Sequence, residues 1–186
     1  MKLPAGILPS DLDIEIFADP ENFGKCFFIQ RGCTQPFYEL PKEVLPALYD
    51  ECLNDKKAVK GLMLMDVDSE NWVEQFNYCN RGKIDGIPDI YRSGKTTTEY
   101  FDCGRRGVCP GEGLCCKPLS IDGVKITHRE RECLSYIKSG KTDKQIKVQM
   151  GFTSQASVNS LMERLRNKLN VSNRTEMAVI ANQIGV

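Results

Sequence analysis

Apolar and polar positions near the C-terminal end of the chain alternate with the period of α-helices. Thr127 followed by Glu130 has the form of a capping box, in which each side chain accepts a hydrogen bond from the other residue's backbone N–H. Thr142 with Gln145 repeats this form, and Ser154 is suited to cap a further helix. Asn173 with Glu176 can cap a last one. The apolar residues of the four predicted helices are Cys133, Leu134 and Ile137; Ile146 and Met150; Val158, Leu161, Met162, Leu165 and Leu169; and Met177, Ile180, Ala181 and Ile184.

The second and third predicted helices are separated only by the short segment 151–153. A short helix, a tight turn with glycine and a longer amphipathic helix are typical of a helix-turn-helix motif, whose second helix enters the major groove of DNA. At ~100° per residue, the apolar stripe of the longer helix leaves its polar side chains facing outward. The residues expected to contact base edges are Gln155, Asn159, Ser160 and Glu163, and those expected to contact phosphates are Arg164, Arg166 and Lys168, with Thr142 and Lys144 at a further phosphate.

The first 120 residues carry a weaker pattern, interrupted by proline and glycine. The predicted elements are strands at Cys26–Ile29 and Phe37–Leu40 around a turn, helices over residues 42–55 and from Ser69 onward, and a loop over residues 81–100. Pro46 falls near the first turn of its helix, where proline is tolerated. The sequence therefore predicts a small α+β domain over residues 1–120, followed by an all-α four-helix domain over residues 121–186.

Composition and charge exclude some classes of protein and indicate a class of partner. The chain has 186 residues, of which 27% are charged and 41% hydrophobic, and this ordinary globular composition excludes a wholly disordered or fibrous protein. The net charge is zero, but residues 1–120 carry a net −5 and residues 121–186 a net +5. A basic end favours a polyanionic partner. No apolar run approaches the ~20 residues of a membrane span, and the N-terminus lacks the apolar region of a signal peptide, so we expect a cytoplasmic protein without a membrane partner.

Four motif pieces of the C-terminal segment resemble the LuxR-type (GerE/NarL) DNA-binding domain. They are Ile126–Leu134, which is similar to "LTxREREVL"; Ser139–Ile146, similar to "GxSNKEIA"; Ser157-Val158, at the family's Thr-Val; and Lys168–Val171 with Asn173–Glu176, similar to "KLGVxNRTE". The pieces occur in the family's order and spacing over about a third of the chain. The resemblance implies a four-helix domain that binds double-stranded DNA through its third helix and often forms homodimers through its fourth.

The sequence departs from the family at three positions that bear on DNA contacts. Asn159 stands where the family usually has lysine, Leu161 replaces a frequent histidine, and Lys147 replaces an alanine. The family's operator preference therefore cannot be transferred to this chain. Leu161 lies on the apolar stripe, so we expect it to pack.

Two alternatives remain for the same residues. Region 4 of a sigma factor is also a helix-turn-helix, but it normally follows an aromatic and basic region 2 that the first 120 residues lack. The second alternative is a protein–protein interaction module, such as an anti-regulator whose helical tail contacts RNA polymerase or another regulator. The hydrophobic contact of such a module with its partner protein would not show the steep salt dependence of phosphate contacts.

Nine cysteines in a cytoplasmic chain favour metal or redox chemistry over a disulfide framework. The glycine-rich segment 103–116 places Cys103, Cys109 and Cys115 at regular intervals, and the fourth thiol would be Cys79 or, as the less favoured alternative, Cys26. Four thiolates suit a zinc ion in a tetrahedron, and closing such a site would stabilise a small domain. Binding of an iron–sulfur cluster is a second interpretation of the same four thiols. Free thiols or a reversible disulfide are a third.

Enzymatic activity is not expected from this sequence. His128 is the only histidine, and it belongs to the first turn of a predicted C-terminal helix. A serine or cysteine nucleophile in the N-terminal domain would therefore lack a histidine base. The sequence predicts a DNA-binding transcriptional regulator whose N-terminal domain binds metal or senses a signal.

Overall fold

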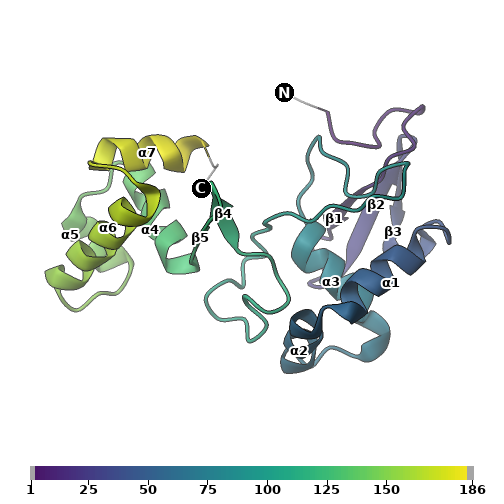
Figure 1. The fold of residues 1–186 in the computed structure, drawn as a ribbon, viewed down its shortest axis with the longest axis horizontal. Coiled ribbons are helices and arrows are strands. Elements are labelled where there is room, and N and C mark those ends of the chain that lie inside the picture. Colours follow the sequence, from purple (N-terminus) through teal and green to yellow (C-terminus); the bar gives the residue numbers. More distant parts are fainter. Residues whose placement is uncertain (1–2, 184–186) are drawn as a thin grey trace. The chain divides into compact units, whose positions relative to one another are not determined.

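A computed structural model describes residues 3–183 of the chain, which divides into two compact units. The N-terminal unit is Met1–Lys117 and the C-terminal unit is Pro118–Val186. Figure 1 shows the elements of each unit, and each unit is described by itself. The predicted helical residue Ile184 lies outside the described residues. No helix among the described residues is long and apolar enough to cross a membrane.

The N-terminal unit contains a three-stranded antiparallel sheet in the order β1-β2-β3. Its strands are β1 (Glu15–Ala18), β2 (Cys26–Gln30) and β3 (Cys33–Pro36). The prediction of a strand at Phe37–Leu40 was wrong, because β3 ends before it and η1 (Phe37–Glu39) is a 3₁₀ turn. Arg31 and Gly32 both have positive φ, 53° and 77°, as in a two-residue hairpin turn. This turn is tighter than the turn over residues 31–35 that the two predicted strands implied, so the second strand begins earlier, at Cys33.

Three helices pack with this sheet. They are α1 (Leu45–Asn54), α2 (Lys56–Leu64) and α3 (Trp72–Arg81), the last preceded by the 3₁₀ turn η2 (Ser69–Asn71). The predicted helix over residues 42–55 begins three residues later in the structure, and α2 was not predicted. Asp55 separates α1 from α2, because its carboxylate caps α2 by accepting hydrogen bonds from the N–H groups of Lys57 and Ala58 at 2.9 and 3.0 Å.

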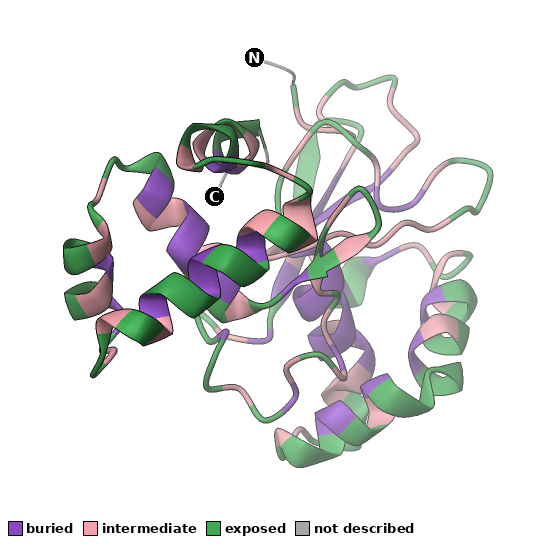
Figure 2. Cartoon of the chain, turned by 60° about the vertical axis from the view of Figure 1, so that its left-hand side comes forward, coloured by how far each residue is buried: buried purple, intermediate pink, exposed green. Residues whose placement is uncertain are grey.

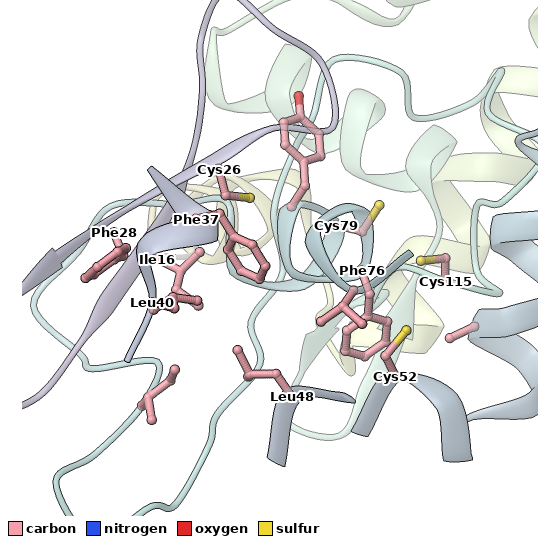
Figure 3. Packing of buried hydrophobic residues seen from close by; sticks show 14 of the residues in the cluster. Ile16, Cys26, Phe28, Phe37, Leu40, Leu48, Cys52, Phe76, Cys79 and Cys115 are labelled. Carbon is pink, nitrogen blue, oxygen red and sulfur yellow. The ribbon is translucent and has the colours of Figure 1, made fainter. Parts of the chain in front are cut away.

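The core of the N-terminal unit lies between α3 and the sheet, and α1 and α2 close it from the other side (Figure 3). Aliphatic, aromatic and thiol side chains share this core. The residues labelled in Figure 3 are Ile16, Cys26, Phe28, Phe37, Leu40, Leu48, Cys52, Phe76, Cys79 and Cys115. Thiols behave here as small hydrophobic groups, so burial alone does not assign them a chemical role.

The segment after α3 has little regular structure but is held by specific contacts. Ile90 forms a bridge with Ile14 beside the sheet. Arg106 is 8% exposed, and its guanidinium donates hydrogen bonds to the carbonyl groups of Phe101 and Lys117. Gly61 of α2 lies against Cys115, and a Cβ atom at Gly61 would come within 2.9 Å of the Cys115 backbone nitrogen. The cysteine-bearing segment is therefore packed directly on α2 and α3.

Two carboxyl groups are buried at β1, one on the strand itself and one next to it. Asp89 accepts a hydrogen bond from the N–H of Ile16 at 2.8 Å, and Glu15 accepts one from the N–H of Asp85 at 2.5 Å. The second carboxylate oxygen of Glu15, Oε2, is buried without a hydrogen-bond partner among the described residues. Burial chiefly raises the pKa of Glu15 to about 8 and that of Asp89 to about 9, since a charged carboxylate loses its hydration there.

The C-terminal unit starts with a β-hairpin and continues with helices. The hairpin strands are β4 (Leu119–Ile121) and β5 (Val124–Ile126), and the helices are α4 (His128–Lys138), α5 (Asp143–Gln149), α6 (Gln155–Leu169) and α7 (Arg174–Gln183). The expectation of an all-α domain is corrected by this hairpin. Asp122 and Gly123 form its turn with φ of 48° and 80°, and an Asp-Gly pair between apolar residues is a hairpin signal that the sequence analysis overlooked.

Candidate nucleic-acid interface

The predicted capping boxes of α4 and α5 are confirmed. Thr127 caps α4, and its backbone N–H donates to the Glu130 carboxylate at 2.8 Å. Thr142 and Gln145 cap α5 in the same reciprocal way. Replacing such a cap by alanine typically costs ~1 kcal/mol of stability, so these residues fix where each helix begins.

Helix α6 has one buried and one exposed side. The apolar residues Val158, Leu161 and Leu165 are at most 2% exposed, which confirms the core of the predicted stripe. Leu161 packs as expected from its place on the apolar stripe, while Leu169 is only half-buried. Figure 2 shows buried and exposed residues alternating along the helices of this unit. The exposed polar residues of α6 are Asn159, Ser160, Glu163, Arg164 and Asn167.

The turn between α5 and α6 is held by contacts from α4. The Arg129 guanidinium donates to the carbonyl of Met150 at 3.1 Å and lies over the Phe152 ring, 5.5 Å from its centroid. Gly151 has a φ of 65°, a left-handed conformation that favours glycine. Ser154 then caps α6 by accepting a hydrogen bond from the N–H of Ser157 at 3.2 Å. These contacts fix the direction in which α6 leaves the turn.

Three predicted contact residues on α6 have partners within the unit. The Gln155 side-chain amide donates to Asn159 Oδ1 at 3.3 Å, so these two amides are held together. Lys168 Nζ lies 2.7 Å from the Glu130 carboxylate. Burial opposes ionisation of Glu130, but the hydrogen bonds from Lys168 and Thr127 outweigh it and lower the pKa of Glu130. Lys168 therefore has a structural role, and a phosphate contact would compete with its ion pair.

The remaining predicted contact residues differ in accessibility. Lys144 and Arg164 are exposed, whereas Arg166 is half-buried. The Thr142 hydroxyl is exposed but already forms hydrogen bonds with Gln145, including one to its side-chain oxygen at 3.1 Å. Lys144 and Arg164 are thus the two predicted cationic contacts that combine full exposure with a position on the helix-turn-helix.

Arg174 was missed by the sequence analysis as a structural residue. Its guanidinium forms an ion pair with Asp143 and donates a hydrogen bond to the carbonyl of Lys141. These contacts join the start of α7 to the start of α5. Arg174 lies in the motif piece Asn173–Glu176, where Asn173 accepts a hydrogen bond from the N–H of Glu176 at 2.9 Å. The motif therefore included Arg174, but it did not predict the ion pair of Arg174 with Asp143.

The four predicted metal ligands do not converge on one point. The thiols of Cys79 and Cys115 lie beside each other, and their interaction lowers the pKa of Cys79 and raises that of Cys115. Cys109 instead contacts Met65, with 3.4 Å between the two sulfur atoms, and Cys103 is half-buried against the core. Within residues 3–183 no three His, Cys, Asp or Glu side chains are placed to hold a metal ion. The arrangement does not fit a tetrahedral thiolate site, and binding of zinc or an iron–sulfur cluster stays a prediction.

Comparison with known proteins agrees with the geometry of the C-terminal unit. The family model described as "Bacterial regulatory proteins, luxR family" matches residues 124–181. The chain is also similar to the "Uncharacterized transcriptional regulatory protein YvfU" of Bacillus subtilis (strain 168), with 25% identity over 157 residues. That alignment covers 84% of this chain and 64% of the relative, so the chain spans less than two thirds of the relative's length. No solved structure matches the chain. The capped helices, the buried stripe of α6 and the family match together identify residues 124–181 as a LuxR-family domain.

Proposed function

We propose that this protein is a transcriptional regulator that binds duplex DNA by placing α6 in the major groove. The observation that carries the proposal is the two-sided character of α6. Val158, Leu161 and Leu165 fix one side to the rest of the unit, and the opposite side is polar and exposed. A helix held in this way can enter a groove about 12 Å wide without unfolding its support.

The exposed residues of α6 have the chemistry that base edges require. The amide of Asn159 can both donate to and accept from adenine, and the Glu163 carboxylate can accept from the amino group of cytosine. The hydrogen bond from Gln155 orients the Asn159 amide before DNA arrives. Lys144 and Arg164 would contact phosphates beside the groove and set the register of the helix.

We further propose that two copies bind DNA together through α7. Val179 of α7 is 52% exposed and lines a shallow hollow with Val171, Thr175 and Ile180. Pairing of two such surfaces would remove apolar area from water. Two α6 helices in a dimer would reach successive major grooves about 34–36 Å apart.

The salt dependence of DNA binding tests this function. We expect the affinity for a fluorescent 30-base-pair duplex to fall by about 10³-fold between ~50 and ~200 mM salt, because a dimer with about three phosphate contacts per copy releases about six counterions. Fluorescence anisotropy measures this directly. A monomer with three contacts would lose only about 40-fold over the same range. An affinity independent of salt, or no binding at 50 mM, would contradict the proposal.

A further inference from the structure

Two thiols that are 36 positions apart in the sequence meet inside the N-terminal unit. Cys79 lies on α3 and is 6% exposed, and Cys115 lies at the end of the cysteine-bearing segment and is 4% exposed. Figure 3 shows both sulfur atoms on the same side of α3. We propose that Cys79 and Cys115 are a redox pair that forms a reversible disulfide bond within the N-terminal unit. This inference is independent of the proposed DNA contacts.

The hydrogen bonds around Cys79 distinguish it from an ordinary buried thiol. The side-chain amide of Gln75 donates to Cys79 Sγ at 3.4 Å, and Gln75 is itself only 5% exposed. The neighbouring thiol of Cys115 acts in the same direction and lowers the pKa of Cys79. Donors directed at a sulfur atom stabilise its anionic form, which is the nucleophilic form of cysteine. The geometry therefore makes Cys79 the attacking thiol and Cys115 the resolving one.

The backbone of Cys115 is held against both neighbouring helices. Asn80 donates through its side-chain amide to the carbonyl of Cys115 at 2.9 Å, and its side-chain oxygen accepts from the N–H of Lys117 at 3.0 Å. The close approach of Gly61 supports the same segment from α2. Because these contacts already order both residues, formation of the bond requires little additional ordering of the chain.

Other cysteines have different surroundings. Cys52 and Cys26 donate to backbone carbonyls, of Trp72 and Glu74 respectively, at 3.8 Å. Cys109 faces the sulfur of Met65, and Cys133 faces that of Met162. Cys116 is adjacent to Cys115 in sequence but is only half-buried beside the core. Cys103 and Cys116 also lie near Cys79, but among the described thiols Cys115 is the one that interacts directly with the Cys79 side chain.

A hydroperoxide is the class of oxidant that balances the reaction. The Cys79 sulfur attacks one peroxide oxygen and breaks the O–O bond, and the departing oxygen leaves as water with the thiol proton. This step converts Cys79 to a sulfenic acid. The Cys115 sulfur then attacks the Cys79 sulfur and displaces the hydroxyl group, which leaves as water with the proton of Cys115. Two thiols lose two electrons, and hydrogen peroxide becomes two molecules of water.

The test uses the full chain treated with stoichiometric hydrogen peroxide, followed by alkylation and mass spectrometry. We expect a loss of about 2 Da with two fewer alkylated thiols, and a tryptic cross-link between peptides 61–81 and 107–125 that fragmentation assigns to Cys79 and Cys115. Dithiothreitol should restore both thiols. The near-isosteric Cys79→Ser and Cys115→Ser should abolish the cross-link, whereas Cys116→Ser and the exposed Cys33→Ser should retain it.

The outcomes distinguish a Cys79–Cys115 disulfide from other cysteine pairings, from unreacted thiols and from thiols that bind zinc. Fluorescence of Trp72, the single tryptophan, checks that each variant keeps the fold of the N-terminal unit. Because the wild-type cross-link is mapped without any substitution, misfolding of a variant would not obscure the result. A cross-link from Cys79 to Cys103 or Cys116 would overturn the proposal. So would full alkylation of both thiols after peroxide, or their protection by one equivalent of bound zinc.

Discussion

Replacing Lys144 and Arg164 together by glutamate is expected to weaken binding to duplex DNA by about 100-fold or more at ~100 mM salt. Both side chains are exposed on the helix-turn-helix, and each reversal turns a phosphate attraction into a repulsion. The salt dependence of the remaining binding should also become shallower, by about one unit of slope for each lost phosphate contact. Fluorescence anisotropy with the same duplex measures both effects.

The matched control is the pair Lys57→Glu and Lys60→Glu. It makes the same change in net charge with two exposed lysines of α2, in the other unit, and Lys57 has the same position in its helix as Lys144 has in α5. Lys168 is left unchanged because its ion pair with Glu130 supports the cap of α4. Equal losses in both double variants would mean that net charge, rather than the α6 surface, governs binding.

The N-terminal unit is expected to lose stability as the pH rises from about 5 to about 9. In the folded chain the pKa of Glu15 is raised to about 8 and that of Asp89 to about 9, chiefly by burial. The folded state therefore holds protons that the unfolded state releases above pH ~4.5, so the free energy of unfolding falls through this window by several kcal/mol. Urea unfolding followed by Trp72 fluorescence reports on this unit alone, since Trp72 is the only tryptophan.

Neutral variants separate this effect from other titrations. Glu15→Gln keeps an oxygen that can accept the hydrogen bond from Asp85 but carries no charge at any pH. We expect it to be more stable than the wild type at pH 9 and to flatten the pH profile. Glu43→Gln, at an exposed position, should leave the profile unchanged. A wild-type stability that stays constant or increases from pH 5 to pH 9 would refute the assignment.

The C-terminal unit was largely predictable because its local signals agree with one another. The capping boxes at Thr127 and Thr142, the cap at Ser154 and the apolar stripe of α6 each indicate the same helices. Local agreement of this kind needs no knowledge of distant contacts. The exposed polar surface of α6 could also be predicted, because the apolar stripe determines which side of the helix is buried and therefore which side is exposed. The ion pair of Lys168 with Glu130 could not be predicted, since it joins residues 38 positions apart.

The N-terminal unit was less predictable because its structure depends on contacts between distant residues. Helix α2 has a polar first turn and a short apolar stretch. Its glycine at position 61 is typical of a helix end in the sequence, whereas in the structure it leaves room for Cys115 to pack against the helix. The position of β3 was set by the turn at Arg31 and Gly32, where arginine gives no signal for a positive φ. Regular cysteine spacing likewise suggested a four-thiol site, whereas the chain directs Cys109 toward Met65 instead.

The most direct test of the central claim is a titration of the isotope-labelled chain, residues 1–186, with a duplex, followed by nuclear magnetic resonance. If α6 enters the major groove, the largest shifts fall on the side-chain amide of Asn159 and on the backbone amides of Ser160, Glu163 and Arg164. The amides of buried Val158 and Leu165 should shift less. Largest shifts in the N-terminal unit or on α7, with the exposed side of α6 unchanged, would contradict the account.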